Sequence, residues 1–233
     1  MVKKKTMLLI VCTLAVALLL SGWYFLYHLD ANKSCIMGEN TSQKEEGMEE
    51  VNVPSTRPFV RVSLQPLGDF TQKETERLQK DLEKHLSGMV DIDMLFEVLP
   101  SKPLEDTWKN DAKSRYRADK IINSMAVSAN KQHVIIALTH KDVSVSYKGN
   151  KDWGVLGLSL IPKKVCVVST YRLRDKRDLW KVATHEFIHT CFEYRHCPKD
   201  NPTCIMKDAK GHANFSNKER LCDVCKKEIY RRY

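Results

Sequence analysis

The segment from His185 to His196 limits what this chain can fold into more than any other part of its sequence. His185-Glu186-Phe187-Ile188-His189 places two histidines one helical turn apart, about 6 Å along the axis, so both imidazoles can reach one metal ion. Glu186 lies about 100° around the helix from His185, beside such an ion rather than on it. We therefore expect the Glu186 carboxylate to activate a zinc-bound water.

A third protein ligand would leave zinc one open position, and His196 offers it after the helix. Glu193 competes by its spacing, four residues beyond His189. In a continuous helix, however, Glu193 would lie about 12 Å along the axis from His185, too far for all three groups to meet one ion. The chain is therefore expected to turn between Cys191 and Tyr194.

The cysteines are spaced as metal ligands rather than as disulfide partners. Four of the eight crowd around the histidine motif in the C-terminal segment: Cys197, Cys204, Cys222 and Cys225. The other four are scattered and have no obvious mate: Cys12, Cys35, Cys166 and Cys191. A local disulfide or redox pair at Cys222 and Cys225 is the alternative, which an oxidising compartment would favour.

Strands and helices alternate upstream of the histidines. Thr71 and Glu74 form a capping box that opens a helix ending at Gly88. The pattern further predicts strands from Phe59 and at 91–99, 133–138 and 165–169, an edge strand at 153–161, and helices at 111–125 and from Asp175 into the motif. Because 133–138 is almost wholly apolar, we expect it to be a central strand of a largely parallel sheet.

The amino terminus predicts a membrane segment. An uncharged apolar run at residues 7–27, long enough to span a bilayer, follows the lysines of a basic segment, residues 1–6. Those lysines predict that the segment before the span is cytoplasmic and the domain after it lies outside the cytoplasm. A retained signal anchor is expected, and a cleaved signal, giving an exported or periplasmic protein, is the alternative. Residues 28–57 read as a flexible linker to a domain at 58–233.

The net charge of +9 does not indicate nucleic-acid binding, because of where the charge lies. Residues 1–6 supply three positive charges, and residues 197–233 carry nine Lys/Arg against five Asp/Glu. Zinc-bound thiolates would reduce the excess in that C-terminal segment. We therefore expect no nucleic-acid partner.

The segment from His185 to Cys197, followed by Cys204-Ile205-Met206 and Cys222-Asp223-Val224-Cys225, resembles the archaemetzincin signature, HExxHxxGxxHC with CxM and CxxC. Weaker similarity upstream extends the resemblance to residues 59–233. It implies an α/β, metzincin-like fold with a mixed, mostly parallel sheet and an active-site helix. An upper subdomain at 58–190 would precede a small zinc-stabilised C-terminal lobe at 191–233.

The resemblance also implies two zinc ions per chain. The catalytic zinc would be held by His185, His189 and His196, with Glu186 as the base and Met206 in a methionine turn. The structural zinc would be held by Cys197, Cys204, Cys222 and Cys225. The implied protein is a zinc metallopeptidase acting on peptide or protein substrates. We separately expect it to be monomeric. A catalytically idle, membrane-anchored zinc-binding ectodomain is the alternative.

The chain departs from that signature at the end of the active-site helix. Phe192 stands where the family pattern has glycine, and one extra residue separates His189 from His196. Glycine normally provides the left-handed residue that ends a helix. A different turn geometry, which the inserted residue permits, is therefore expected here.

Overall fold

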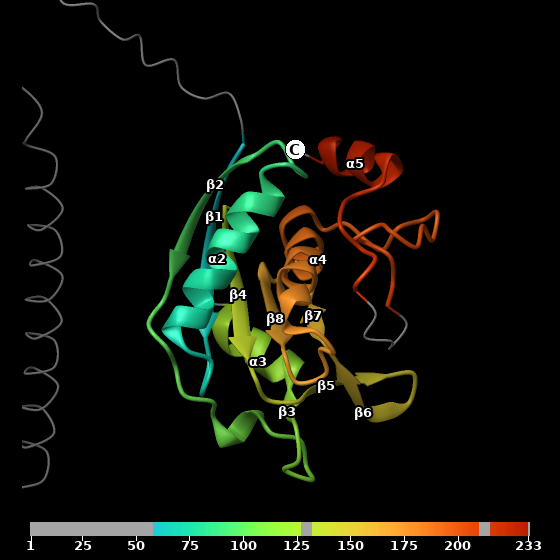
Figure 1. The fold of residues 1–233 in the computed structure, drawn as a ribbon. Helices are drawn as coiled ribbons and strands as arrows, with labels where there is room; N and C mark the ends of the chain where they lie inside the picture. Colours follow the sequence, from blue (N-terminus) through green and yellow to red (C-terminus); the bar gives the residue numbers. More distant parts are fainter. Residues whose placement is uncertain (1–57, 127–131, 210–214, 233) are drawn as a thin grey trace, which may run out of the picture. The chain divides into compact units, whose positions relative to one another are not determined.

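A five-stranded sheet with the order β2-β1-β4-β8-β7 forms the centre of this computed structural model, which describes residues 58–126, 132–209 and 215–232 (Figure 1). Four strands are parallel: β1 (Phe59–Pro66), β2 (Asp93–Val98), β4 (His133–Thr139) and β8 (Val165–Ser169). β7 (Gly157–Ser159) pairs antiparallel with β8 at the edge. The mixed, mostly parallel sheet predicted from the sequence is thus confirmed.

Helices cover both faces of this sheet. α2 (Gln72–Leu86) and α4 (Leu179–Phe192) pack on one face, and α3 (Ala118–Met125) packs on the other. Side chains of β4 alternate between the two cores, with Ile136 on the α2 and α4 side and Ile135 on the α3 side. The prediction of a central strand at 133–138 is therefore confirmed.

α2 begins at the predicted capping box. The Thr71 hydroxyl accepts the Glu74 N–H at 3.2 Å, and the Glu74 carboxylate accepts the Thr71 N–H at 3.0 Å. Such a cap stabilises a helix by about 1 kcal/mol. The helix then buries Leu78, Leu82 and Leu86 against the sheet.

The helix predicted at 111–125 was too long. The chain first makes a turn, then the short strand β3 (Tyr116–Arg117), and α3 starts only at Ala118. The Asn110 side chain accepts the backbone N–H groups of Ser114 and Arg115 at 2.9 and 3.3 Å. Side-chain bonds of this kind compete with helical hydrogen bonding, which explains the late start.

The edge strand predicted at 153–161 is two strands. β6 (Asn150–Val155) pairs with β5 (Val143–Tyr147) in a second sheet of order β3-β5-β6, and β7 joins the main sheet after Leu156. The hairpin between β5 and β6 was not predicted. Lys148 and Gly149 have positive φ values of 46° and 82° at its turn. A Lys-Gly pair signals such a turn less clearly than Asn-Gly.

The C-terminal segment has little regular structure apart from α5 (Asp223–Tyr230), which was not predicted. It has no core of its own among the described residues. Its buried side chains instead join the core formed by α2 and α4; they include Tyr194, Ile205, Met206, Phe215, Leu221 and Ile229. Figure 1 shows this segment beside α4, with α5 drawn in red at the upper right.

The predicted membrane segment at 7–27 and the linker at 28–57 lie outside the described residues. Within the described ranges, no helix combines the length and the apolar character needed to cross a membrane.

Candidate active site

α4, preceded by the short 3-10 turn at Lys176–Asp178, carries the first two histidines into a buried position. Nδ1 of His185 lies 2.7 Å from the Ile205 carbonyl oxygen, and Nδ1 of His189 lies 2.5 Å from that of Tyr194. Because a carbonyl oxygen only accepts, each Nδ1 donates, which leaves both Nε2 lone pairs free for a metal. The two Nε2 atoms are 3.0 Å apart.

His196 reaches the same point from the chain beyond the helix. Its ring centroid lies 5.3 Å from that of His185 and 4.8 Å from that of His189. One nitrogen from each of the three rings lies within 4.8 Å of the others. In a tetrahedral zinc site the ligand nitrogens are about 3.4 Å apart, so small side-chain adjustments would complete one. The structure thus brings together the three histidines singled out in the sequence.

The electrostatics of the site keep the histidines neutral. Burial, reinforced by the neighbouring His189, holds the pKa of His185 well below its ordinary value. Burial also lowers the pKa of His189 to about 4 and lowers the pKa of His196. Neutral imidazole is the form that binds metal, so this environment suits a ligand cluster.

The turn that ends α4 is made one residue later than the family signature would place it. Glu193 adopts the left-handed conformation with φ 52°, while Phe192 stays helical and buried. The Phe192 ring packs against Phe187 at 5.9 Å between centroids. Lys164 and Arg232 donate to the last carbonyl groups of the helix. The helix thus still ends on a left-handed residue, which the inserted residue moves to Glu193, so the different turn geometry expected from the sequence is not used.

Glu186 is held between α4 and β7. Its side chain is buried, and the Ser159 hydroxyl lies 2.7 Å from Oε2. A Cβ added to Gly157 would come within 2.7 Å of Oε1, so the carboxylate occupies space that only glycine leaves open. Burial raises the pKa of Glu186 to about 7, and the Ser159 hydrogen bond opposes that rise. Sequence reasoning missed both β7 residues, because only the fold brings them to the helix.

The four C-terminal cysteines gather in a second cluster, and all are free thiols. Sγ of Cys197 lies 3.7 Å from Sγ of Cys222, and Sγ of Cys204 lies 3.7 Å from Sγ of Cys225. A disulfide would bring two sulfurs to about 2.05 Å. Tetrahedral zinc with bonds of about 2.3 Å holds its sulfurs about 3.8 Å apart, which fits the observed spacing.

The start of α5 favours a thiolate at Cys204, whereas the pKa values of Cys222 and Cys225 are raised. Cys222 is the N-cap of α5, and its backbone N–H points to Sγ of Cys204 at 3.4 Å. The contacts with the Cys225 thiol and with this N–H lower the pKa of Cys204 to about 5. Thiolates are the form in which cysteines bind metal.

A turn from Cys204 to Lys207 joins the two clusters. It is closed by a 3.0 Å bond from the Lys207 N–H to the Cys204 carbonyl, and it buries Met206 completely. The Met206 carbonyl accepts the Cys197 N–H at 2.8 Å, and the Ile205 carbonyl holds His185. The residue expected in a methionine turn therefore directly follows the carbonyl that holds His185.

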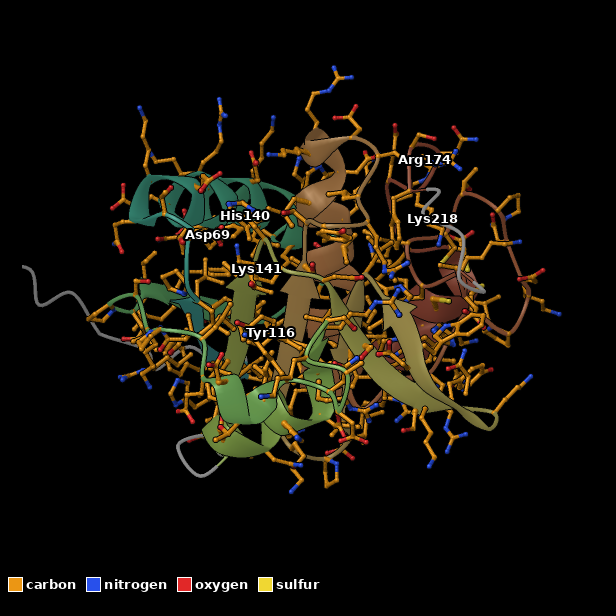
Figure 2. The ribbon with its side chains drawn as sticks, turned by 90° about the horizontal axis from the view of Figure 1, so that it is seen from below. Asp69, Tyr116, His140, Lys141, Arg174 and Lys218 are labelled. Carbon is orange, nitrogen blue, oxygen red and sulfur yellow. The ribbon has the colours of Figure 1, made fainter. Side chains whose placement is uncertain are left out.

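Other described histidines lie away from this site. His140 follows β4 and bonds Thr170 and Glu74 at 2.7 and 3.2 Å, near the Lys141–Asp69 ion pair labelled in Figure 2. His85 stacks on Trp180, and His133 contacts Ser63. His212 lies outside the described residues.

Comparison with known proteins gives consistent results. No family model matches the chain. Curated relatives named Archaemetzincin, from two strains of Halobacterium salinarum, are 26% identical over 187 residues, which cover 73% of this chain and 100% of each relative.

Solved structures give the same likeness. The crystal structure of archaemetzincin from Methanopyrus kandleri matches with a TM-score of 0.62 and 20% identity over 77% of this chain and 98% of that one. Archaemetzincin from Archaeoglobus fulgidus, complexed with malonate, matches with a TM-score of 0.56 and 22% identity. The match covers 72% of this chain and 99% of that one. A zinc-dependent peptidase from Methanocorpusculum labreanum matches with a TM-score of 0.56 and 18% identity. The match covers 72% of this chain and 99% of that one. The fold is that of the archaemetzincins, and the curated relatives support the same family for the chain.

Proposed function

We propose that this chain, archaemetzincin-like in fold and in its curated relatives, is a zinc metallopeptidase that hydrolyses peptide bonds in peptides or proteins. The observation that carries this proposal is the convergence of His185, His189 and His196, with the buried carboxylate of Glu186 carried by the same helix next to His185. A zinc site that only held structure would need no carboxylate at this position. The name of the Methanocorpusculum neighbour, a zinc-dependent peptidase, agrees with the proposal.

The proposed chemistry divides between the metal and one side chain. A zinc ion bound by three imidazoles would have its fourth coordination position open. It would polarise a carbonyl and lower the pKa of water. Glu186 would take the proton of the attacking water and return it to the leaving amine nitrogen. Its carboxylate extends from α4 to β7, where it meets Ser159 and the space at Gly157.

We assign a second, structural zinc to Cys197, Cys204, Cys222 and Cys225. Four thiolates complete a tetrahedron and leave no position for substrate. The 3.7 Å sulfur separations support this assignment. Such an ion would hold in place a segment whose regular structure is otherwise one short helix. It would also fix the position of His196, which is adjacent to Cys197.

An extended substrate has a suitable strand beside the base. In the described part of the sheet, β7 is one of the two edge strands and pairs only with β8. A peptide can add to such an edge through backbone hydrogen bonds. Since Gly157 and Ser159 of β7 both touch Glu186, a peptide bound there would pass close to the proposed base.

The peptidase proposal is tested by metal removal and return. Zinc-loaded protein is incubated with a peptide library, and cleavage is followed by mass spectrometry before chelation, after chelation and after zinc is restored. We expect cleavage that is lost on chelation and recovered with zinc. A fully loaded protein that cleaves no peptide would contradict the proposal and favour the catalytically idle ectodomain.

We also propose that residues 7–27 anchor the chain, with the peptidase domain outside the cytoplasm. The support is the basic segment followed by an apolar run of spanning length. Protease added to intact cells should then remove the domain from the cell surface. Complete protection of the domain, with cleavage only after the cells are lysed, would contradict this topology.

A further inference from the structure

We propose that Ser159 is a positioning residue for catalysis, whose hydroxyl fixes one oxygen of the Glu186 carboxylate and leaves the other for the reacting water. The proposal rests on the proposed peptidase function and deepens it. Ser159 belongs to β7, far from the histidine motif in sequence, and no spacing rule pointed to it.

The hydrogen-bond geometry around Ser159 favours donation to the carboxylate. The hydroxyl has one proton and three acceptors within reach: Glu186 Oε2 at 2.7 Å, the Glu186 carbonyl at 2.9 Å and Thr190 Oγ1 at 3.0 Å. A charged carboxylate is about twice as strong an acceptor as a neutral oxygen, and it is also the nearest. The Ser159 proton therefore goes to Oε2.

Thr190 supports this arrangement from one turn further along α4. Its buried hydroxyl lies 2.7 Å from the Glu186 carbonyl and 3.0 Å from the Ser159 oxygen, and it can donate to either. In either case the oxygen that accepts the Thr190 proton is not Oε2, so Thr190 leaves Oε2 free to accept from Ser159. Oε2 remains the nearest and the strongest of the three acceptors that the Ser159 proton can reach.

Gly157 fixes the second carboxylate oxygen by shape. Residues 157 and 159 are two positions apart on β7, so they face the same side of the strand, toward α4. A Cβ at position 157 would approach Cγ, Cδ and Oε1 of Glu186 to 2.7–2.9 Å, closer than real Cβ atoms come. Among the described residues no side chain donates to Oε1. Ser159 therefore holds Oε2, and the missing side chain at Gly157 leaves room for Oε1, which no described side chain engages.

A merely structural role for Ser159 would give different kinetics. Loss of one half-buried hydroxyl that only stabilised β7 would lower the unfolding temperature and leave turnover per folded molecule unchanged. Loss of a group that orients the base lowers kcat while KM and zinc content stay constant. The two roles can therefore be separated in one set of variants.

The experiment compares zinc-loaded full-length wild type with Ser159→Ala and Ser159→Thr on a peptide that the wild type cleaves. We expect Ser159→Ala to lower kcat by about 10- to 100-fold, as is usual for a group that orients an active-site residue, with KM and bound zinc unchanged. Ser159→Thr, which keeps a hydroxyl, should recover most of kcat. Ser124→Ala, which removes an exposed hydroxyl from α3, is the matched control.

A double-mutant cycle completes the test. The shorter side chain of Glu186→Asp no longer reaches Ser159, so adding Ser159→Ala to it should cost nothing further. Wild-type kcat in Ser159→Ala, a Thr variant as slow as the Ala variant, or an equal loss in the Glu186→Asp background would overturn the proposal. An inactive wild type would instead refute the peptidase function itself, so the two failures are distinguishable.

Discussion

At the scale of single residues, backbone carbonyl groups arrange the histidines as much as the histidines' own spacing does. The carbonyls of Ile205 and Tyr194 hold Nδ1 of His185 and His189, so both rings present Nε2. The sequence predicted both histidines because residues four apart on a helix share a face. It could not predict the carbonyls, which come from a later turn and from the end of the helix.

The residues that end α4 give a first prediction. Phe192→Ala should lower the free energy of unfolding by about 3–5 kcal/mol, because a buried ring packed on Phe187 is lost. Restoring a small residue where the family pattern has glycine would thus be harmful in this chain. Denaturant unfolding of the zinc-loaded protein measures the change.

Glu193→Gly is the matched control for that substitution. Glycine relieves the left-handed backbone by about 1 kcal/mol. The ion pair of Glu193 with Lys164, at 3.0 Å, involves a side chain 43% exposed, so its loss costs less than about 1 kcal/mol. This variant should stay within about 1 kcal/mol of wild type. Similar losses in both variants would contradict our account of the turn.

At the scale of elements, regular patterns were predicted and irregular ones were not. The strand at 133–138 and the capped helix α2 carry strong local signals, and both are present. The helix expected at 111–125 starts only at Ala118, because the Asn110 side chain binds the backbone ahead of it. The β5–β6 hairpin and α5 were missed since a Lys-Gly turn and a helix capped by a cysteine, Cys222, have weak local signatures.

The start of α5 carries the second prediction. Replacing Cys222 and Cys225 together by serine should remove one zinc per chain, because the cluster keeps only Cys197 and Cys204. The C-terminal segment should then become sensitive to proteolysis, since zinc binding there contributes directly to folding. Metal content and limited proteolysis measure the two effects.

Substitution of Cys191 is the matched control for loss of a thiol. Cys191 lies on α4, outside the cluster, and its thiol is also free. Cys191→Ser should keep both zinc ions. Unchanged zinc in the double serine variant, or a Cys222–Cys225 disulfide in protein purified under reducing conditions, would be incompatible with a structural zinc.

At the scale of the whole molecule, one core on the α2 and α4 side supports both the sheet and the C-terminal segment. The sequence predicted the sheet from its alternating elements and the segment from its cysteines. It could not predict that β7 would meet Glu186, because contacts between Ser159 or Gly157 and α4 exist only once the sheet has formed. The candidate ligands are therefore readable from spacing, whereas their support requires the fold.

The central claim is that this fold is a zinc peptidase with Glu186 as its base, and Glu186→Gln tests it most directly. The variant should keep the zinc content of wild type, because Glu186 is not one of the three groups that converge as candidate ligands. It should lose about two to four orders of magnitude in kcat, the range for removing general acid-base help. His196→Ala, by contrast, should release the catalytic zinc, which would keep only two protein ligands. Zinc content and peptide cleavage measured side by side should show Glu186→Gln metal-loaded but slow; a metal-loaded variant that cleaves at the wild-type rate would contradict the account.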